Sequence, residues 1–233
     1  MSTCNTRGCG WPSAIIFDLD GTLVDSVPDL AGSLNTLLAD AFGLPELPIA
    51  EVRNMIGAGV PKLIERGLKA HGADHDAARI EALLPKFMEI YLARATQDTA
   101  LFPGAAEILK AYSEAGVKLG LCTNKPTDVS EQILRDLGVR EWFGSVIGGT
   151  SGYAKKPDPE PMMVCMEELG VIAARTVFVG DSIADVETAR NANLPVIVMS
   201  YGYTPIPAAE LGGDVVIDRL DEIPQAIEGL KSA

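Results

Sequence analysis

The chain has 233 residues, enough for one large domain or two small ones with a sizeable buried core. Its 32 acidic and 19 basic residues give a formal net charge of −13, which repels nucleic acids and anionic membranes at long range. The longest apolar runs are strand-length and the first residues lack the apolar core of a signal peptide, so we expect a soluble cytoplasmic protein with no nucleic-acid or membrane partner.

The four cysteines are too few for a disulfide framework in a chain of this length. Cys4 and Cys9 form a C-x4-C pair, but no second pair or suitably spaced histidine completes a zinc site. We therefore expect a reduced N-terminal tail. Cys122 and Cys165 fall in segments that have the composition of a protein core.

Short apolar runs alternate with helical patterns along most of the chain. The strand candidates are residues 14–20, 117–124, 145–149, 176–181, 195–200 and 214–218. Helical patterns lie near residues 104–115, 127–138, 159–170 and 183–192. Because the strand candidates are mostly continuous apolar runs, they are typical of a parallel sheet buried on both faces. The predicted fold class is α/β, a doubly wound parallel sheet.

Residues 26–97 interrupt this alternation, because they show only helical periodicity. The first apolar stripe consists of Val27, Leu30, Leu34, Leu37, Leu38 and Ala41. Ser26 with Asp29 resembles a capping box, and Pro28 suits the first turn of a helix. We expect a small helical cap domain at 26–97, inserted into a catalytic core formed by 1–25 and 98–233.

Two acidic residues follow the first predicted strand in the stretch FDLDGTLVDS. On an extended segment the side chains of Asp18 and Asp20 point to the same face. Two such carboxylates can bind a divalent cation, or act as nucleophile and general acid/base. The same pattern also suits a plain solvated turn, in which Gly21 and Thr22 redirect the backbone.

Two further stretches offer groups that can bind an anion. LCTNKP ends a predicted strand in Thr123 and Asn124, which can donate to a phosphate oxygen or simply cap the next helix. KKPDPEP places Lys155 and Lys156 before a proline-stiffened turn. Either lysine can neutralise a phosphoryl group or remain a surface charge.

The stretch FVGDSIADVETAR ends another predicted strand in Asp181 and places Asp185 on the following helix. Oxygen ligands at this spacing suit Mg²⁺, which needs only a few carboxylates. Ser182 can equally cap that helix, with Asp185 favouring its first turn. In a doubly wound sheet, ligands bind outside the carboxyl ends of the strands, so these groups are expected at one edge.

Together the four stretches resemble the haloacid dehalogenase (HAD) superfamily of phosphohydrolases, over essentially the whole chain after the first dozen residues. The resemblance implies Asp18 as nucleophile and Asp20 as acid/base, with Thr123, Asn124 and Lys156 on the substrate's phosphoryl group. It favours Lys156 over Lys155, because Lys156 directly precedes proline. The expected cofactor is Mg²⁺, with the metal set Asp18, Asp20, Asp181 and Asp185.

Longer stretches resemble the phosphoglycolate phosphatases within this superfamily. They are FDLDGTLVDSVPDL, IGAGVPKLIERGL, LGLCTNKP, VIGG, KKPDPEP, VFVGDSIADVETARNA and YGYT. The resemblance implies hydrolysis of 2-phosphoglycolate through an aspartyl-phosphate. We expect a monomer or a homodimer. Asp20 favours phosphate esters, because members that cleave carbon–halogen or carbon–phosphorus bonds differ there. A phosphatase or phosphomutase of another small phosphate, and a non-catalytic binding protein, remain alternatives.

The carboxylate of the implied substrate, 2-phosphoglycolate, is expected to meet a donor from the cap or its hinge. Arg53 and the backbone at Gly57-Ala58-Gly59 are the candidates. Arg53 also suits a solvated position on a helical surface, and the glycines also suit a turn between two helices.

Overall fold

The structure, a computed structural model, describes residues 10–231, so Cys4 and Cys9 lie outside the described residues. The described chain forms two compact units: one runs up to Val24 and resumes at Leu101, and the other is Asp25–Ala100. The sequence predicts an inserted cap at residues 26–97, which lies within the second unit. That this unit acts as a lid stays a prediction. None of the helices within residues 10–231 is long and apolar enough to cross a membrane.

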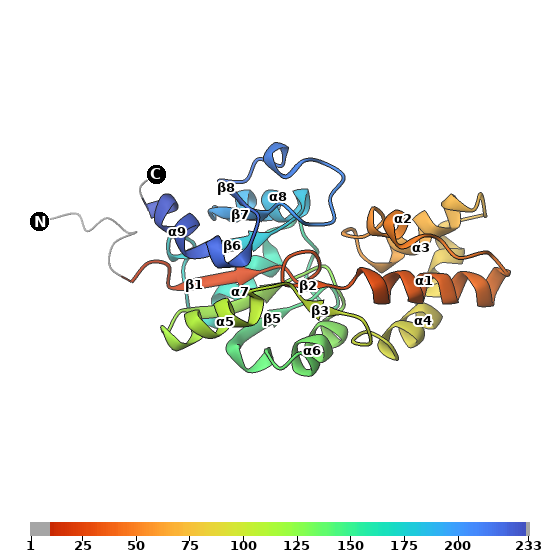
Figure 1. The fold of residues 1–233 in the computed structure, drawn as a ribbon, viewed down its shortest axis with the longest axis horizontal. Helices are drawn as coiled ribbons and strands as arrows, with labels where there is room; N and C mark the ends of the chain where they lie inside the picture. Colours follow the sequence, from red (N-terminus) through yellow and green to blue (C-terminus); the bar gives the residue numbers. More distant parts are fainter. Residues whose placement is uncertain (1–9, 232–233) are drawn as a thin grey trace, which may run out of the picture. The chain divides into compact units, whose positions relative to one another are not determined.

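A six-stranded sheet forms the centre of the first unit, with the strand order β5-β4-β1-β6-β7-β8 (Figure 1). Its strands are β1 (Ala14–Phe17), β4 (Lys118–Cys122), β5 (Phe143–Ile147), β6 (Thr176–Gly180), β7 (Val196–Met199) and β8 (Val215–Ile217). All neighbouring pairs are parallel. The predicted α/β fold class is therefore confirmed, and each strand overlaps its predicted segment.

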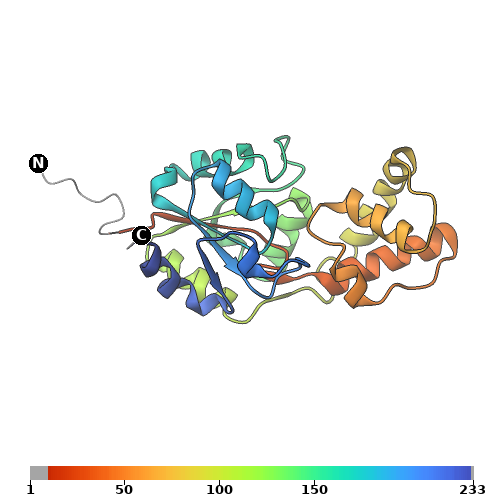
Figure 2. The same cartoon turned by 90° about the horizontal axis from the view of Figure 1, so that it is seen from above.

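In the described part of this unit there are five α-helices: α5 (Ala105–Glu114), α6 (Thr127–Asp136), α7 (Glu160–Leu169), α8 (Ile183–Asn191) and α9 (Ile223–Lys231). Short 3-10 turns lie at Arg140–Trp142, Ala173–Arg175, Ala208–Glu210 and Leu220–Glu222. Helices α7 and α8 cover one face of the sheet, while α5 and α9 lie on the other (Figure 2). Because both faces are covered, the strands carry continuous apolar runs.

Strand β1 lies in the middle of the sheet, between β4 and β6. All four of its side chains are fully buried, and Ile16 packs with Phe178 in the cluster beneath α7 and α8. The ladder continues beyond the strand, because the Asp18 N–H donates to the Val179 carbonyl at 2.9 Å. The backbone at Asp18 is therefore fixed by fully buried strands in the middle of the sheet.

The second unit consists of helices α1 (Val27–Phe42), α2 (Ile49–Arg53), α3 (Val60–Ala70) and α4 (Ala77–Leu92). The predicted apolar stripe of α1 is buried except for its last member, Ala41, which is exposed. Two very short strands, β2 (Val24–Asp25) and β3 (Ala100–Leu101), pair with each other where the chain passes between the units.

The predicted capping box at the start of α1 is wrong. Ser26 makes no side-chain capping bond, and the Asp25 carboxylate accepts the Val27 N–H at 3.2 Å instead. Asp29 is fully buried, and its Oδ2 accepts the Thr99 N–H and hydroxyl, both at 2.8 Å. Asp29 therefore ties α1 to the returning chain, a long-range bond that a local pattern does not reveal. Pro28 does lie in the first turn, as predicted.

Candidate active site

Three aspartates meet at the carboxyl edge of the sheet. Asp18 follows β1 and Asp181 follows β6, its neighbour, while Asp185 lies in the first turn of α8. One carboxylate oxygen from each lies within 4.8 Å of the others, and all three residues are buried. Buried carboxylates this close repel one another unless a cation offsets their charge. The arrangement suits a hard divalent cation.

Lys156 provides one positive charge inside this group. Its Nζ lies 2.9 Å from Asp18 Oδ1 and 2.6 Å from Asp185 Oδ1, and its side chain is 3% exposed. Its backbone N–H donates to Asn124 Oδ1 at 2.9 Å, and Asn124 Nδ2 donates to its carbonyl at 3.1 Å. Asn124 therefore holds the lysine loop in place. Lys155, the alternative in the sequence, is exposed.

Asp185 forms the helix start that the sequence allowed, and it also belongs to the group of three aspartates. Its Oδ2 accepts the Ser182 N–H at 2.9 Å and the Ser182 hydroxyl at 2.6 Å, completing a capping box at the start of α8. The same oxygen accepts the Asp181 N–H at 3.1 Å, while Oδ1 accepts from Lys156. Asp185 thus ties the Asp181 backbone and the lysine to one helix end.

Asp181 is held on both of its oxygens. The Thr22 hydroxyl donates to Oδ1 at 3.2 Å, and the Tyr203 N–H donates to Oδ2 at 2.8 Å. Glycines pack against it: a Cβ at Gly21 would lie 2.5 Å from Asp181 Oδ2, and one at Gly202 would lie 2.3 Å from the same atom. The YGYT stretch therefore serves to position this carboxylate.

Gly202→Ala is expected to weaken divalent-cation binding about 10- to 100-fold, because the new methyl group displaces the Asp181 side chain. Titration calorimetry with Mg²⁺ measures this directly. Gly229→Ala is the matched control, because a Cβ at Gly229 in α9 meets no atom within 4 Å. Equal affinity in the Gly202 variant and the control would contradict this role.

Burial and uncompensated charge shift the pKa values of the site. Burial raises the pKa of Asp18 to about 6; Lys156 opposes this rise, and the charge of Asp185 adds to it. Burial, and then the charges of Asp185 and Asp18, hold the pKa of Asp181 well above its usual value. Burial alone would lower the pKa of Lys156. The charges of Asp18 and Asp185 have the larger combined effect, so the pKa of Lys156 is raised. Lys156 is therefore a permanent cation.

Asp20 lies outside the group of three carboxylates. Its Oδ1 accepts from Lys125 Nζ at 2.7 Å. Lys125 is not among the residues predicted for the site, although its place directly after Thr123-Asn124 is a usable signal. Thr123 is buried after β4, and its Oγ1 accepts the Lys125 N–H at 3.3 Å. These contacts place the predicted acid/base, on the loop after β1, against the loop after β4 that carries the predicted threonine.

Arg53 is the last residue of α2 and belongs to the second unit. Gly57 and Gly59 both have positive φ, and Gly59 is the N-cap of α3. The glycines therefore form the turn between two helices, one of the two interpretations that the sequence allowed. A role for this segment in substrate binding stays a prediction.

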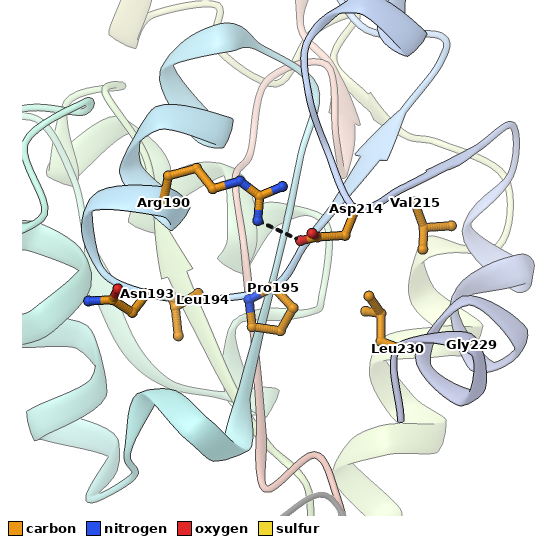
Figure 3. A pocket seen from close by; sticks show the side chains of 8 residues that line it. All are labelled: Arg190, Asn193, Leu194, Pro195, Asp214, Val215, Gly229 and Leu230. Carbon is orange, nitrogen blue, oxygen red and sulfur yellow. Dashed lines mark hydrogen bonds and ion pairs between the residues drawn. The ribbon is translucent and has the colours of Figure 1, made fainter. Parts of the chain in front are cut away.

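A separate pocket of about 520 Å³ lies beside the amino ends of β7 and β8, at the opposite end of the strands from the aspartates (Figure 3). Its lining includes Arg190 and Asp214, which form an ion pair at 2.9 Å. The Arg190 guanidinium also donates to the Gly212 carbonyl at 2.8 Å. Because these charges already satisfy each other, the aspartate group is the better candidate for the active site.

Known proteins resemble this chain over most of its length. A family model described as haloacid dehalogenase-like hydrolase matches residues 15–199. A phosphoglycolate phosphatase from Caulobacter vibrioides is 43% identical over 214 residues, which cover 92% of this chain and 90% of that protein. Another from Rhodospirillum rubrum is 41% identical, over 89% of this chain and 87% of that protein.

Solved structures show the same architecture. The crystal structure of a predicted phosphoglycolate phosphatase from Haemophilus somnus superposes with a TM-score of 0.87 at 32% identity. The match covers 94% of this chain and 99% of that one. The similarity thus spans both compact units of the chain.

Proposed function

The chain belongs to the haloacid dehalogenase-like hydrolases, and from this membership we propose that it is a Mg²⁺-dependent phosphatase that hydrolyses 2-phosphoglycolate to glycolate and inorganic phosphate. The observation that carries the proposal is the buried Asp18–Lys156 pair at the end of the central strand. Relatives that cover most of the chain are named phosphoglycolate phosphatases, which supports the choice of substrate.

Asp18 acts as the nucleophile. Its carboxylate attacks phosphorus, an O–P bond to Asp18 forms, and the bond from phosphorus to the leaving oxygen breaks. The backbone of Asp18 is held by the β1–β6 ladder, so the attacking group is positioned before substrate arrives. Lys156 offsets the repulsion between carboxylate and phosphate, and the Thr123 hydroxyl donates to a phosphoryl oxygen.

Asp20 moves the protons. It protonates the leaving oxygen of the ester during the first step. In the second step it takes a proton from water, whose oxygen bonds to phosphorus as the bond from phosphorus to Asp18 breaks. Inorganic phosphate leaves, and both aspartates return to their starting states. Asp20 lies apart from the group of three carboxylates, which supports separate roles for Asp18 as nucleophile and Asp20 as acid/base.

The charges of the site fit a divalent cation. Four carboxylates, those of Asp18, Asp20, Asp181 and Asp185, are accompanied by the two buried ammonium groups of Lys125 and Lys156. The surplus of two negative charges, when all are ionised, matches Mg²⁺. Asp18 and Asp181 would hold the ion, with Asp185 beside them; Asp20, predicted in the same set, bonds Lys125. When bound, the cation neutralises charge on the phosphoryl group.

A substrate panel tests the proposal. It measures phosphate release from 2-phosphoglycolate, sugar phosphates and nucleotides, in Mg²⁺ or in EDTA. We expect 2-phosphoglycolate to have the highest kcat/KM. Preference for another ester would exclude 2-phosphoglycolate as the preferred substrate and leave the proposed phosphatase mechanism unchanged. A phosphomutase would instead keep its phosphoenzyme from hydrolysis, so a time course of phosphate release distinguishes it from a phosphatase. The absence of turnover with every ester would favour a non-catalytic binding protein.

Arg53 is proposed to bind the carboxylate of the substrate, since a guanidinium pairs well with that group. Arg53→Ala is expected to raise KM for 2-phosphoglycolate about tenfold, in line with the loss of a charged hydrogen bond. KM for ethyl phosphate, which lacks the carboxylate, should change little. Arg79→Ala, at an exposed position of α4 in the same unit, is the control. An unchanged KM for 2-phosphoglycolate would remove Arg53 from the site.

The monomeric or homodimeric state and the cytoplasmic location expected from the sequence both stay predictions. The catalytic chemistry, the substrate, the metal and the role of the cap are each tested by a separate measurement. Failure of the cap prediction would therefore leave the nucleophile and the metal untouched.

A further inference from the structure

Lys125 is a second buried lysine at the carboxyl edge of the sheet. Its side chain is 2% exposed, and its Nζ lies 2.7 Å from Asp20 Oδ1. Its backbone is fixed on both sides, because its N–H donates to Thr123 Oγ1 at 3.3 Å and its carbonyl accepts the Gly149 N–H at 2.7 Å. The ammonium group therefore projects from a rigid loop.

The two buried lysines divide the carboxylates between them. Lys156 pairs with Asp18 and Asp185, and Lys125 pairs with Asp20. A buried ammonium is costly unless it is paired, and each of these lysines has a carboxylate within 3 Å. Asp20 is thereby kept apart from the group of three acids, although it lies only two residues from Asp18.

We propose that Lys125 is a positioning residue that holds Asp20 for proton transfer. This inference rests on the proposed function. With Oδ1 bonded to the ammonium, Oδ2 carries the proton that goes to the leaving oxygen as its bond to phosphorus breaks. The same oxygen receives a proton from water when the aspartyl-phosphate is hydrolysed. Without Lys125, the Asp20 side chain loses a bond that helps to fix its direction.

Direct recognition of the substrate's carboxylate by Lys125 is the competing role. The Lys125 side chain is almost entirely buried, and its Nζ is already in contact with Asp20. A second carboxylate would have to share or displace that bond. The geometry therefore favours the role through Asp20, and the choice of substrates in the test separates the two.

The test compares leaving groups, with kcat/KM as the readout because it reports the first phosphoryl transfer. Nitrophenolate leaves without protonation, whereas an alkoxide needs a proton. In Lys125→Met we expect kcat/KM for ethyl phosphate and 2-phosphoglycolate to fall about 10- to 100-fold. The value for p-nitrophenyl phosphate should fall less than about threefold. Lys125→Arg, which keeps the charge, should restore part of the loss.

A double variant keeps the test decisive where Lys125→Met folds poorly. Asp20→Asn with Lys125→Met removes both charges of the pair and leaves no ionised partner buried alone. Because Lys125 acts through Asp20, the double variant should be no slower than Asp20→Asn. Lys110→Met, at an exposed site on α5, is the control.

Three results would overturn this role. Equal losses with alkyl and nitrophenyl esters would show general damage to the site. A loss confined to 2-phosphoglycolate would assign Lys125 to the substrate's carboxylate. A double variant much slower than Asp20→Asn would show a function independent of Asp20. If the wild type hydrolysed none of the three esters, the proposed function itself would fail, and the role of Lys125 with it.

Discussion

Asp18→Asn is expected to lower kcat by about 10⁴-fold or more, because the amide cannot form the covalent bond to phosphorus. Asparagine matches aspartate in shape, and the Asp18 backbone is fixed by its bond to Val179, so the fold should persist. The measurement is steady-state phosphate release from 2-phosphoglycolate in Mg²⁺, with circular dichroism to verify folding.

Acid quenching of the reaction with radiolabelled substrate adds a direct test of the covalent step. The wild type should retain label that hydroxylamine removes, as expected of an acyl-phosphate, and Asp18→Asn should retain none. Asp128→Asn, which changes an exposed acid in the first turn of α6, is the matched control. Wild-type turnover by Asp18→Asn would exclude this aspartate as the nucleophile.

Much of the fold is predictable because the strands are buried on both faces. Mostly continuous apolar runs mark the six strands, and glycine or proline lies next to most of the helices between them. Helix α9 is absent from the prediction, although Ile223, Ala226, Ile227 and Leu230 form its buried stripe. Strands β2 and β3 have two residues each, which is too short for a periodic signal.

In the site, too, features set by local sequence are predictable and contacts between distant residues are not. The aspartates at strand ends are visible in the sequence, because parallel strands bring their carboxyl ends to one edge. The contact between Lys125 and Asp20 joins residues 105 positions apart, so the sequence pattern does not reveal it. The failure of the Ser26 cap has the same cause: Asp29, its expected partner, bonds Thr99 instead.

Removal of the divalent cation is the second large effect expected. EDTA should lower activity about 1,000-fold or more, because a metal contributes several kcal/mol to a phosphoryl transition state and each ~1.4 kcal/mol is tenfold in rate. Added Mg²⁺ should restore the wild type and Asp128→Asn. Asp181→Asn should need far more Mg²⁺, since it removes one of the charges in the buried group. Full activity in EDTA would contradict the metal requirement.

The raised pKa values give metal binding a definite pH dependence. Asp18 has a pKa of about 6, raised chiefly by burial. Below this pH the carboxyl group is protonated and has lost the charge that attracts a cation. The raised pKa of Asp181 acts in the same direction. Mg²⁺ must therefore displace protons, so its affinity should fall as the pH drops through this range. Calorimetry in buffers of different ionisation enthalpy measures the protons released; a pH-independent affinity with no proton release would place the ion away from these two carboxylates.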